Sequence, residues 1–143
     1  DMPEQAPAMD QQEQEEIGRI AIDYFQKTLG SEKLVQKALT GLVHSVKEDG
    51  AKLVHLGNVL FLVLVRGKGV VEVHTIGFEK VPRALAEDFR QLVAYLKNIG
   101  VKTAYTYSND SRFSRIAQLT GLPVKTFPAK IEGEKQTVYV MEL

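Results

Sequence analysis

The segment YTYSNDSRFSRIAQLTGLPV, residues 105–124, carries the strongest local indication of the fold. Its first residues alternate between aromatic and polar side chains, which is the pattern of a β-strand. Asn109 and Asp110 then give a turn signal, and apolar residues recur at helical spacing until Gly121. The segment therefore predicts a strand, a turn and a short helix over about residues 110–120.

The composition is that of an ordinary globular protein and bounds the possible functions. The chain has 143 residues, of which 44% are hydrophobic and 25% are charged, enough for one domain with a substantial core. Its 18 basic and 18 acidic residues cancel, and no basic run occurs, so no nucleic-acid partner is expected. The absence of cysteine excludes disulfides, thiolate metal sites and a cysteine nucleophile.

Neither a metal site nor a membrane span is indicated. The three histidines, His44, His55 and His74, do not have the spacing of a zinc motif, so no metal is expected. The longest apolar stretch, VLFLVLV at residues 59–65, has the length of a strand and is too short to cross a bilayer. No cationic, hydrophobic leader opens the sequence, and we expect a cytoplasmic location.

The chain divides into a short acidic segment and one domain. Residues 1–12 hold two prolines and no apolar core positions, so we expect a flexible tail or linker. Residues 13–143 are expected to fold as a single domain. Helical periodicity covers residues 13–29, 31–49, 82–99 and about 110–120, and strand patterns cover 51–58, 58–69, 70–78, 101–108, 124–131 and 136–143.

This order, ααβββαβαββ, predicts an α/β (α+β) fold with a mixed, mostly antiparallel sheet and helices on both faces. Gly57-Asn58 predicts a two-residue turn within an antiparallel meander over residues 51–78. The strand at residues 101–108 follows a helical crossover, so it is expected to run parallel to the strand before that helix. The apolar stripe of the second helix is expected to lie on the sheet, and Phe89 is expected at the buried centre of the third helix.

The order of elements and the turn after residue 108 resemble the GCN5-related N-acetyltransferase (GNAT) superfamily over roughly residues 13–143. In that family a Gly-rich turn, Arg/Gln-x-x-Gly-x-Gly/Ala, precedes a helix whose N-terminal amides hold the pyrophosphate of acetyl-CoA. Glycine lets the backbone approach the phosphates closely. In this chain the corresponding segment is FEKVPRALAEDF, residues 78–89, which contains no glycine.

The same segment departs from the family in its charges and donors. Pro82 has no N–H to donate, and Glu79 places a negative charge where a pyrophosphate would lie. Lys80 and Arg83 could offset that charge. The segment therefore predicts that no cofactor is bound.

A second family signature, Asn-x-x-Ala-x-x-Leu-Tyr-x-x-x-Gly-Phe, aligns with the segment that ends at Gly121-Leu122. The family's Tyr, which commonly protonates the departing thiolate, corresponds to Ala117, and Asn109 could replace the Asn if the turn differs by one residue. The other aligned positions are Asp110, Phe113 and Ile116. The positions that build the scaffold are kept, and the position that does chemistry is not.

A similar loss of motifs occurs in the GNAT-like internal virion proteins of podophages, which this chain resembles in architecture. The resemblance implies a non-catalytic structural or interaction module, a virion-associated or accessory phage protein that has lost acetyl-CoA binding. Such a protein would bind a protein partner or assemble with itself, in the host cytoplasm or inside the virion. The alternative is an acyl-CoA-dependent N-acyltransferase that uses acetyl-CoA through a divergent pyrophosphate loop.

In that alternative, the resemblance assigns Glu72 as the general base and Lys80, Arg83 and Asn109 as cofactor contacts. Glu72 and His74 project from one face of a strand, a pattern that also suits a pair facing solvent or covered by a helix.

Other polar and aromatic residues leave two interpretations open. Tyr105 and Tyr107 share a strand face, where they could line a thioester groove or pack in the core. Arg112 and Arg115 could bind a phosphate or carboxylate, or simply face solvent. His44 and His55 are expected in packing or surface roles, and Ser111 and Ser114 lack the neighbours of a hydrolase triad.

Overall fold

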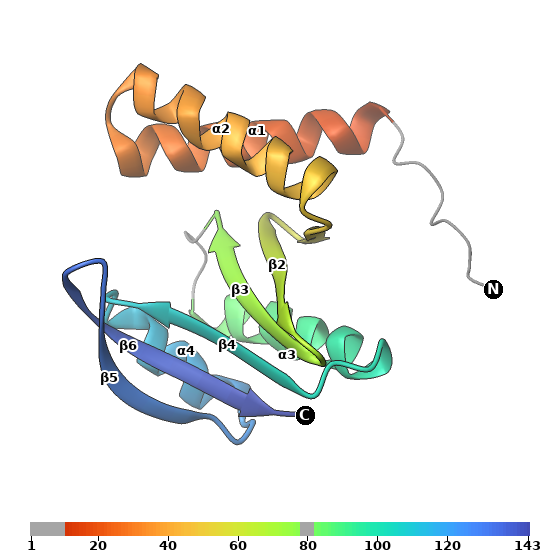
Figure 1. Cartoon of the computed structure of the whole chain (residues 1–143), viewed down its shortest axis with the longest axis vertical. Coiled ribbons are helices and arrows are strands. Elements are labelled where there is room, and N and C mark those ends of the chain that lie inside the picture. The colour runs from red at the N-terminus through yellow and green to blue at the C-terminus, as the bar shows by residue number, and fades with distance from the viewer. Residues whose placement is uncertain (1–10, 78–81) are drawn as a thin grey trace.

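The structure, a computed structural model, describes residues 11–77 and 82–143 (Figure 1). The expected tail therefore lies almost entirely outside the described residues and stays a prediction. The order of elements is the predicted one, although the first helix begins at Gln11 rather than Glu13. The elements are α1 (Gln11–Leu29), α2 (Glu32–Glu48), β1 (Lys52–Leu56), β2 (Val59–Gly67), β3 (Val70–Ile76), α3 (Pro82–Asn98), β4 (Thr103–Ser108), α4 (Arg112–Thr120), β5 (Lys125–Ile131) and β6 (Glu134–Glu142).

The six strands form one sheet in the order β1-β2-β3-β4-β6-β5. All neighbouring strands are antiparallel except β3 and β4, which are parallel, as the helical crossover predicts. Leu56 pairs with Val59, so Gly57-Asn58 forms the predicted two-residue turn. The mixed, mostly antiparallel sheet is thereby confirmed.

The parallel pairing of β3 with β4 is short, and the two strands separate beyond it (Figure 1). Only residues 70–72 pair with residues 103–105. The pairing is anchored where the Gly69 carbonyl accepts hydrogen bonds from the N–H groups of Lys102 and Thr103, at 2.8 and 2.9 Å. Gly69 has a φ of +73°, and a Cβ there would lie 3.1 Å from Lys102 Cγ, so glycine suits both the turn and the close approach.

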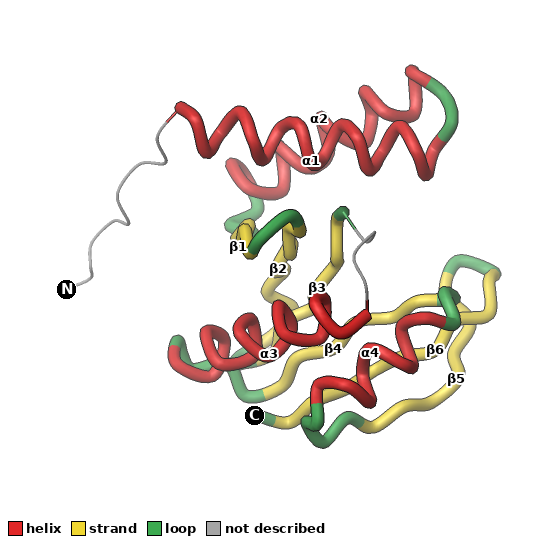
Figure 2. The backbone as a smooth tube through the Cα atoms, turned by 180° about the vertical axis from the view of Figure 1, so that it is seen from behind, coloured by secondary structure: helices red, strands yellow, loops and turns green. Residues whose placement is uncertain are grey.

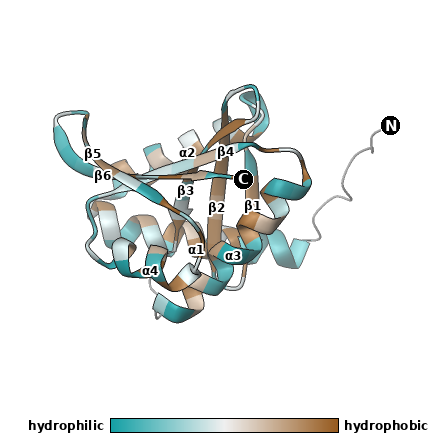
Figure 3. Cartoon of the chain, turned by 90° about the horizontal axis from the view of Figure 1, so that it is seen from below, coloured by the Kyte–Doolittle hydropathy of each residue, from teal (hydrophilic) through white to brown (hydrophobic). Residues whose placement is uncertain are grey.

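The central strand β2 is covered on both faces, which explains its continuous apolar sequence. Val59, Phe61 and Val63 face a core that includes α3 and α4. Leu60 and Leu62 face a second core that includes α1. The hydrophobic colouring of β2 is visible in Figure 3. Helices therefore lie on both sides of this part of the sheet, as predicted.

The two helical layers differ in how closely they pack. α3 and α4 lie together against one face of the sheet (Figure 2), whereas α2 packs chiefly on α1, which contacts β2 and β3. The expectation that the α2 stripe lies on the sheet is therefore wrong in part: Val35 is buried, but Leu34, Val43 and Val46 are exposed. No helix among the described residues is long and apolar enough to cross a membrane.

The apolar face of α3 forms the centre of the larger core. Leu85, Leu92 and Leu96 are almost completely buried. Phe89 is only partly buried, so the prediction that it marks the buried centre of the helix is wrong. Its ring instead stands edge-on to those of Phe61 and Phe113, with centroids 4.9 and 5.4 Å apart.

Arg90 ties α3 to the end of α4, a contact that the sequence did not predict. Its Nη1 donates to the carbonyl oxygens of Leu119 and Thr120 at 2.9 and 3.2 Å. Glu87 holds the other side of the guanidinium at 2.6 and 2.9 Å. A cation at the C-terminus of a helix also interacts favourably with its dipole.

We expect Arg90→Ala to lower the free energy of unfolding by about 1.5–3 kcal/mol, because it leaves two part-buried carbonyls without a charged donor. Arg115→Ala, on the exposed face of α4, is the matched control and should change stability by less than about 0.5 kcal/mol. Chemical denaturation of both variants measures the difference. Equal effects would contradict a structural role for Arg90.

Candidate functional site

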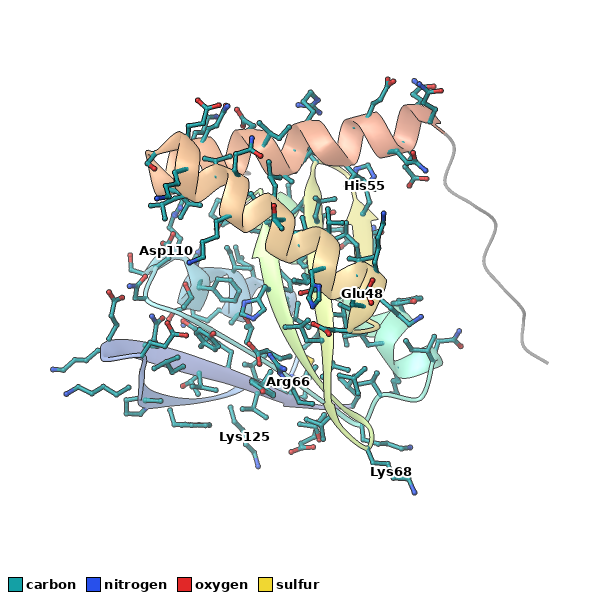
Figure 4. All side chains as sticks on the ribbon, turned by 45° about the horizontal axis from the view of Figure 1, so that its top comes forward. Glu48, His55, Arg66, Lys68, Asp110 and Lys125 are labelled. Atoms are coloured by element: carbon teal, nitrogen blue, oxygen red, sulfur yellow. The ribbon has the colours of Figure 1, made fainter. Side chains whose placement is uncertain are left out.

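A cluster of polar and aromatic side chains surrounds Glu72 at the point where β3 and β4 separate. Arg66, labelled in Figure 4, lies near the end of β2 and donates to Glu72, and His74 follows two residues later on β3. Tyr105 and Tyr107 join it from β4. We call these five residues the Glu72 cluster.

The strand register explains why these side chains meet. Alternate residues of a strand share one face, so Glu72 and His74 project together, as do Tyr105 and Tyr107. Glu72 pairs with Tyr105 in the last register position before the strands separate. On the other side Glu72 lies opposite Leu64. The register then shifts between Val65 and Gly67, and Arg66 lies at this irregularity.

The carboxylate of Glu72 is buried and accepts hydrogen bonds from three side chains. The Glu72 residue is only 7% exposed. Its Oε1 accepts from Arg66 Nε at 2.8 Å and from the Tyr105 hydroxyl at 3.0 Å, while His74 Nε2 lies 2.5 Å from Oε2. The ring of Tyr107 stands perpendicular to that of His74, with centroids 5.5 Å apart.

The same contacts set the ionisation of the cluster. Burial alone raises the pKa of Glu72, but the hydrogen bond from Arg66, the charge of His74 and the Tyr105 hydroxyl outweigh it, so the pKa lies below its usual value. Burial, followed by the bond to Glu72, raises the pKa of Tyr105. The cluster therefore holds Glu72 in its ionised form.

An ionised Glu72 in these surroundings is a poor proton acceptor. A general base works best when its pKa is near the working pH and a lone pair can reach the substrate. Both oxygens of Glu72 already have donors, and its pKa is shifted away from neutrality. The arrangement can orient His74 and Tyr105 more readily than it can accept a proton.

An apolar cavity lies on the other face of the sheet, near the strand opening. Its volume is about 70 Å³, and its wall includes Val73 and Ala104 of the sheet, Phe89 of α3 and Ala117 of α4. Ala117, the position aligned with the family's Tyr, therefore faces this cavity. Its methyl group brings no proton donor there.

The residues predicted to contact a cofactor are not brought into the Glu72 cluster. Arg83 is exposed in the first turn of α3, and Asn109 is exposed in the turn after β4. Lys80, like Glu79, lies outside the described residues. The hydrogen-bond partners of Glu72 include neither Arg83 nor Asn109.

The chain fits acetyl-CoA poorly. The sequence has no glycine from residue 78 to residue 89, and Pro82, the first residue of α3, has no N–H. Ala117 offers no hydroxyl to a thiolate, and the cavity beside it is apolar. The helix start therefore offers few backbone donors to a pyrophosphate, and position 117 offers no proton donor to the leaving thiolate of the cofactor.

The remaining candidates have structural partners. Asp110 accepts a hydrogen bond from the Arg112 N–H at 2.9 Å and pairs with its guanidinium at 2.6 Å, so these two residues stabilise the start of α4. Ser114 Oγ lies 2.9 Å from the Tyr139 hydroxyl.

The two histidines outside the Glu72 cluster lie apart from it. His44 is exposed beside Asp49 on α2. His55 Nε2 lies 2.7 Å from the Gly57 carbonyl oxygen, while its other ring nitrogen approaches Glu13. Among the described residues, no group of three or more acidic or histidine side chains could hold a metal ion.

Arg66 is the member of the cluster that sequence reasoning missed. It ends an apolar strand, a position that suggests solvent exposure, and its side chain is indeed 48% exposed. The strand pattern gave no signal for this contact, because Arg66 lies where the β2–β3 register shifts between Val65 and Gly67.

Comparison with known proteins supports the fold. No protein-family profile and no curated protein matches the chain. Among solved structures, it is similar to a Bacillus subtilis acetyltransferase in complex with CoA, with a TM-score of 0.51 and 12% identity over 98% of this chain and 97% of that chain. A protein assigned as a phosphinothricin N-acetyltransferase gives a TM-score of 0.42 and 14% identity over 59% of this chain and 63% of that chain. The similarity to the Bacillus subtilis structure shows that the chain has the GNAT fold that the sequence predicted.

We expect Glu72→Gln to make stability less dependent on pH. The pKa of Glu72 is lower in the folded than in the unfolded protein, so its ionised form stabilises the fold above its ordinary pKa of 4.5 and this stabilisation is lost on acidification. Between about pH 6 and about pH 3 the free energy of unfolding should therefore fall further in the wild type than in Glu72→Gln. Denaturant unfolding at each pH measures this, with Glu134→Gln, on an exposed residue outside the cluster, as the control. Parallel curves for wild type and Glu72→Gln would contradict the assignment.

Proposed function

We propose that this chain is a non-catalytic interaction module with a GNAT fold, one that does not use acetyl-CoA. The observation that carries the proposal is the closed Glu72 cluster: the buried carboxylate has three donors at 2.5–3.0 Å and a lowered pKa. An ionised, fully hydrogen-bonded Glu72 stabilises the junction of β3 and β4. Its release for catalysis would leave a buried charge with fewer partners, which costs free energy.

The sequence at the start of α3 and at position 117 of α4 supports the same proposal independently. A glycine-free segment with Pro82 and Glu79 offers little to a pyrophosphate, and Ala117 offers no proton to a thiolate. The proposed activity is contact with a protein partner or self-assembly. A virion-associated or accessory role in a phage rests on the resemblance to internal virion proteins alone.

The second candidate is an acyl-CoA-dependent N-acyltransferase. One observation favours it: Glu72 lies at the strand opening, with an apolar cavity on the opposite face of the same opening. In this candidate Glu72 would take a proton from an acceptor amine, and Lys80, Arg83 and Asn109 would contact the cofactor.

Titration with coenzyme A separates the two candidates. We expect no saturable shift of the amide resonances of residues 83–86 and no rise in melting temperature at millimolar ligand. A site with a dissociation constant a hundredfold below the ligand concentration would stabilise the fold by about 2.7 kcal/mol, which a melting curve detects readily.

Two controls make the result specific. ATP carries phosphates without the pantetheine arm, so equal shifts with ATP and coenzyme A would indicate only general anion binding and leave the proposal intact. Saturable micromolar binding of coenzyme A alone would overturn the proposal. Thiol release from acetyl-CoA in the presence of amines, abolished by Glu72→Gln, would then establish the second candidate.

A further inference from the structure

The outward face of α1 carries a row of charges that alternate in sign. Glu15, Arg19, Asp23 and Lys27 follow one another at four-residue spacing, so they lie on one ridge of the helix. All four residues are exposed, and α1 lies in the outermost layer of the molecule (Figure 1). Neither candidate function gives this ridge a role.

A shallow groove runs beside the charged ridge. Gly18, Ile22 and Gln26 form the neighbouring row at the same spacing, and residues of both rows line one open hollow. Ile22 is 40% exposed and gives the groove an apolar centre. A Cβ at Gly18 would meet no atom of the described residues within 4 Å, so the fold itself does not require glycine there. Glycine is less stable than alanine inside a helix, and here it leaves the groove deeper.

A ridge beside a groove of the same inclination suits packing against a second helix. In the commonest class of helix packing, ridges of four-residue spacing on one helix enter grooves of the same spacing on the other. The order of the charges then selects the partner and its direction. When a second α1 lies antiparallel and centred on Ala21, Glu15 of each copy meets Lys27 of the other, and Arg19 meets Asp23. A parallel copy in register would instead place like charges together.

The contacts that these charges make within α1 compete only weakly with such pairing. The charged side chains have exposed partners within the helix: Arg19 with Glu16 at 3.7 Å, Lys27 with Asp23 at 3.2 Å, and Glu15 with Gln11 at 3.2 Å. Exposed pairs contribute little to stability, so exchanging them for contacts with another chain costs little. The zero net charge of the chain adds no overall repulsion between two copies.

We propose that the outward face of α1 is a self-association surface, at which two copies of the chain pack antiparallel with the ridge of each in the groove of the other. The inference deepens the proposed function, on which it rests for its biological role, by naming a second copy of the chain as the partner. One pair of helices is a small interface, so the dimer is expected to be weak and reversible.

Sedimentation velocity between about 10 μM and about 1 mM protein covers the range in which a weak dimer forms. The sedimentation coefficient of the wild type should rise with concentration. The rise should be smaller in about 0.5 M salt, because salt screens exposed charge pairs. A chain that stays monomeric at every concentration would overturn the proposal and leave a different protein as the occupant of this surface.

Charge-reversal variants test the antiparallel register. Arg19→Glu and Asp23→Lys each place like charges together at two positions of the dimer, so each variant alone should associate at least about tenfold more weakly than the wild type. An equal mixture of the two variants restores opposite charges at all four positions and should associate as the wild type does. Arg115→Glu, on the exposed face of α4, makes the same change of charge as Arg19→Glu and should leave association unchanged.

The outcomes separate this inference from the proposed function. A mixture that associates no better than either variant alone would overturn the antiparallel pairing, and an equal loss in Arg115→Glu would overturn the location on α1. The substituted positions are exposed and lie outside the Glu72 cluster and the start of α3, so the variants should fold and keep the wild-type response to coenzyme A. A monomeric wild type that ignores coenzyme A would therefore overturn the self-association alone.

Discussion

The structure depends on one short pairing, the three parallel register positions that join β3 to β4. They are fixed at one end by Gly69, whose carbonyl accepts two N–H donors from the start of β4. Beyond Glu72 and Tyr105 the strands separate, although each remains paired on its outer side, β3 with β2 and β4 with β6. A single sheet thus acquires an internal opening without losing its continuity. The polar cluster and the apolar cavity lie near this opening on opposite faces of the sheet.

Glu72 lies at the end of this pairing, where burying its charged carboxylate costs solvation free energy. A carboxylate removed from water loses several kcal/mol of solvation free energy unless charged and hydrogen-bonding partners replace the water. Arg66, His74 and Tyr105 supply those partners from three directions, and two of them come from neighbouring strands. The cluster therefore links β2, β3 and β4 at the last point where β3 and β4 are paired. The requirement to satisfy a buried charge conflicts with the requirement for a free catalytic base.

The sequence predicted the features that depend on local chain chemistry. Gly57-Asn58 fixed a hairpin, and the change from helical to alternating periodicity gave the order of elements, including the parallel β3–β4 pair. It failed where the outcome depends on packing between distant elements. Helix α2 has the same amphipathic pattern whether its apolar stripe packs on the sheet or on α1, so the pattern could not decide between them. Phe89 has the spacing of a buried residue, but a cavity lies beside it in the folded protein. Arg66 could not be placed in the cluster from the strand pattern, because the β2–β3 register shifts at that residue.

In this chain different physical demands act on the residues that build the fold and on the position aligned with the family's Tyr. Phe113 and Ile116 are buried and hold α4 against the sheet, a role that any closely packed apolar side chain can fill. Ala117, one residue further along α4, lines the apolar cavity near the strand opening. Alanine is compatible with the packing there. The facing edges of β3 and β4 nevertheless retain backbone groups that cannot pair with each other once the strands separate. Buried backbone groups require partners, so water, side chains or a bound ligand must satisfy them. Any account of the opening therefore has to name the groups that satisfy these backbone donors and acceptors, whether or not the residues around it perform catalysis.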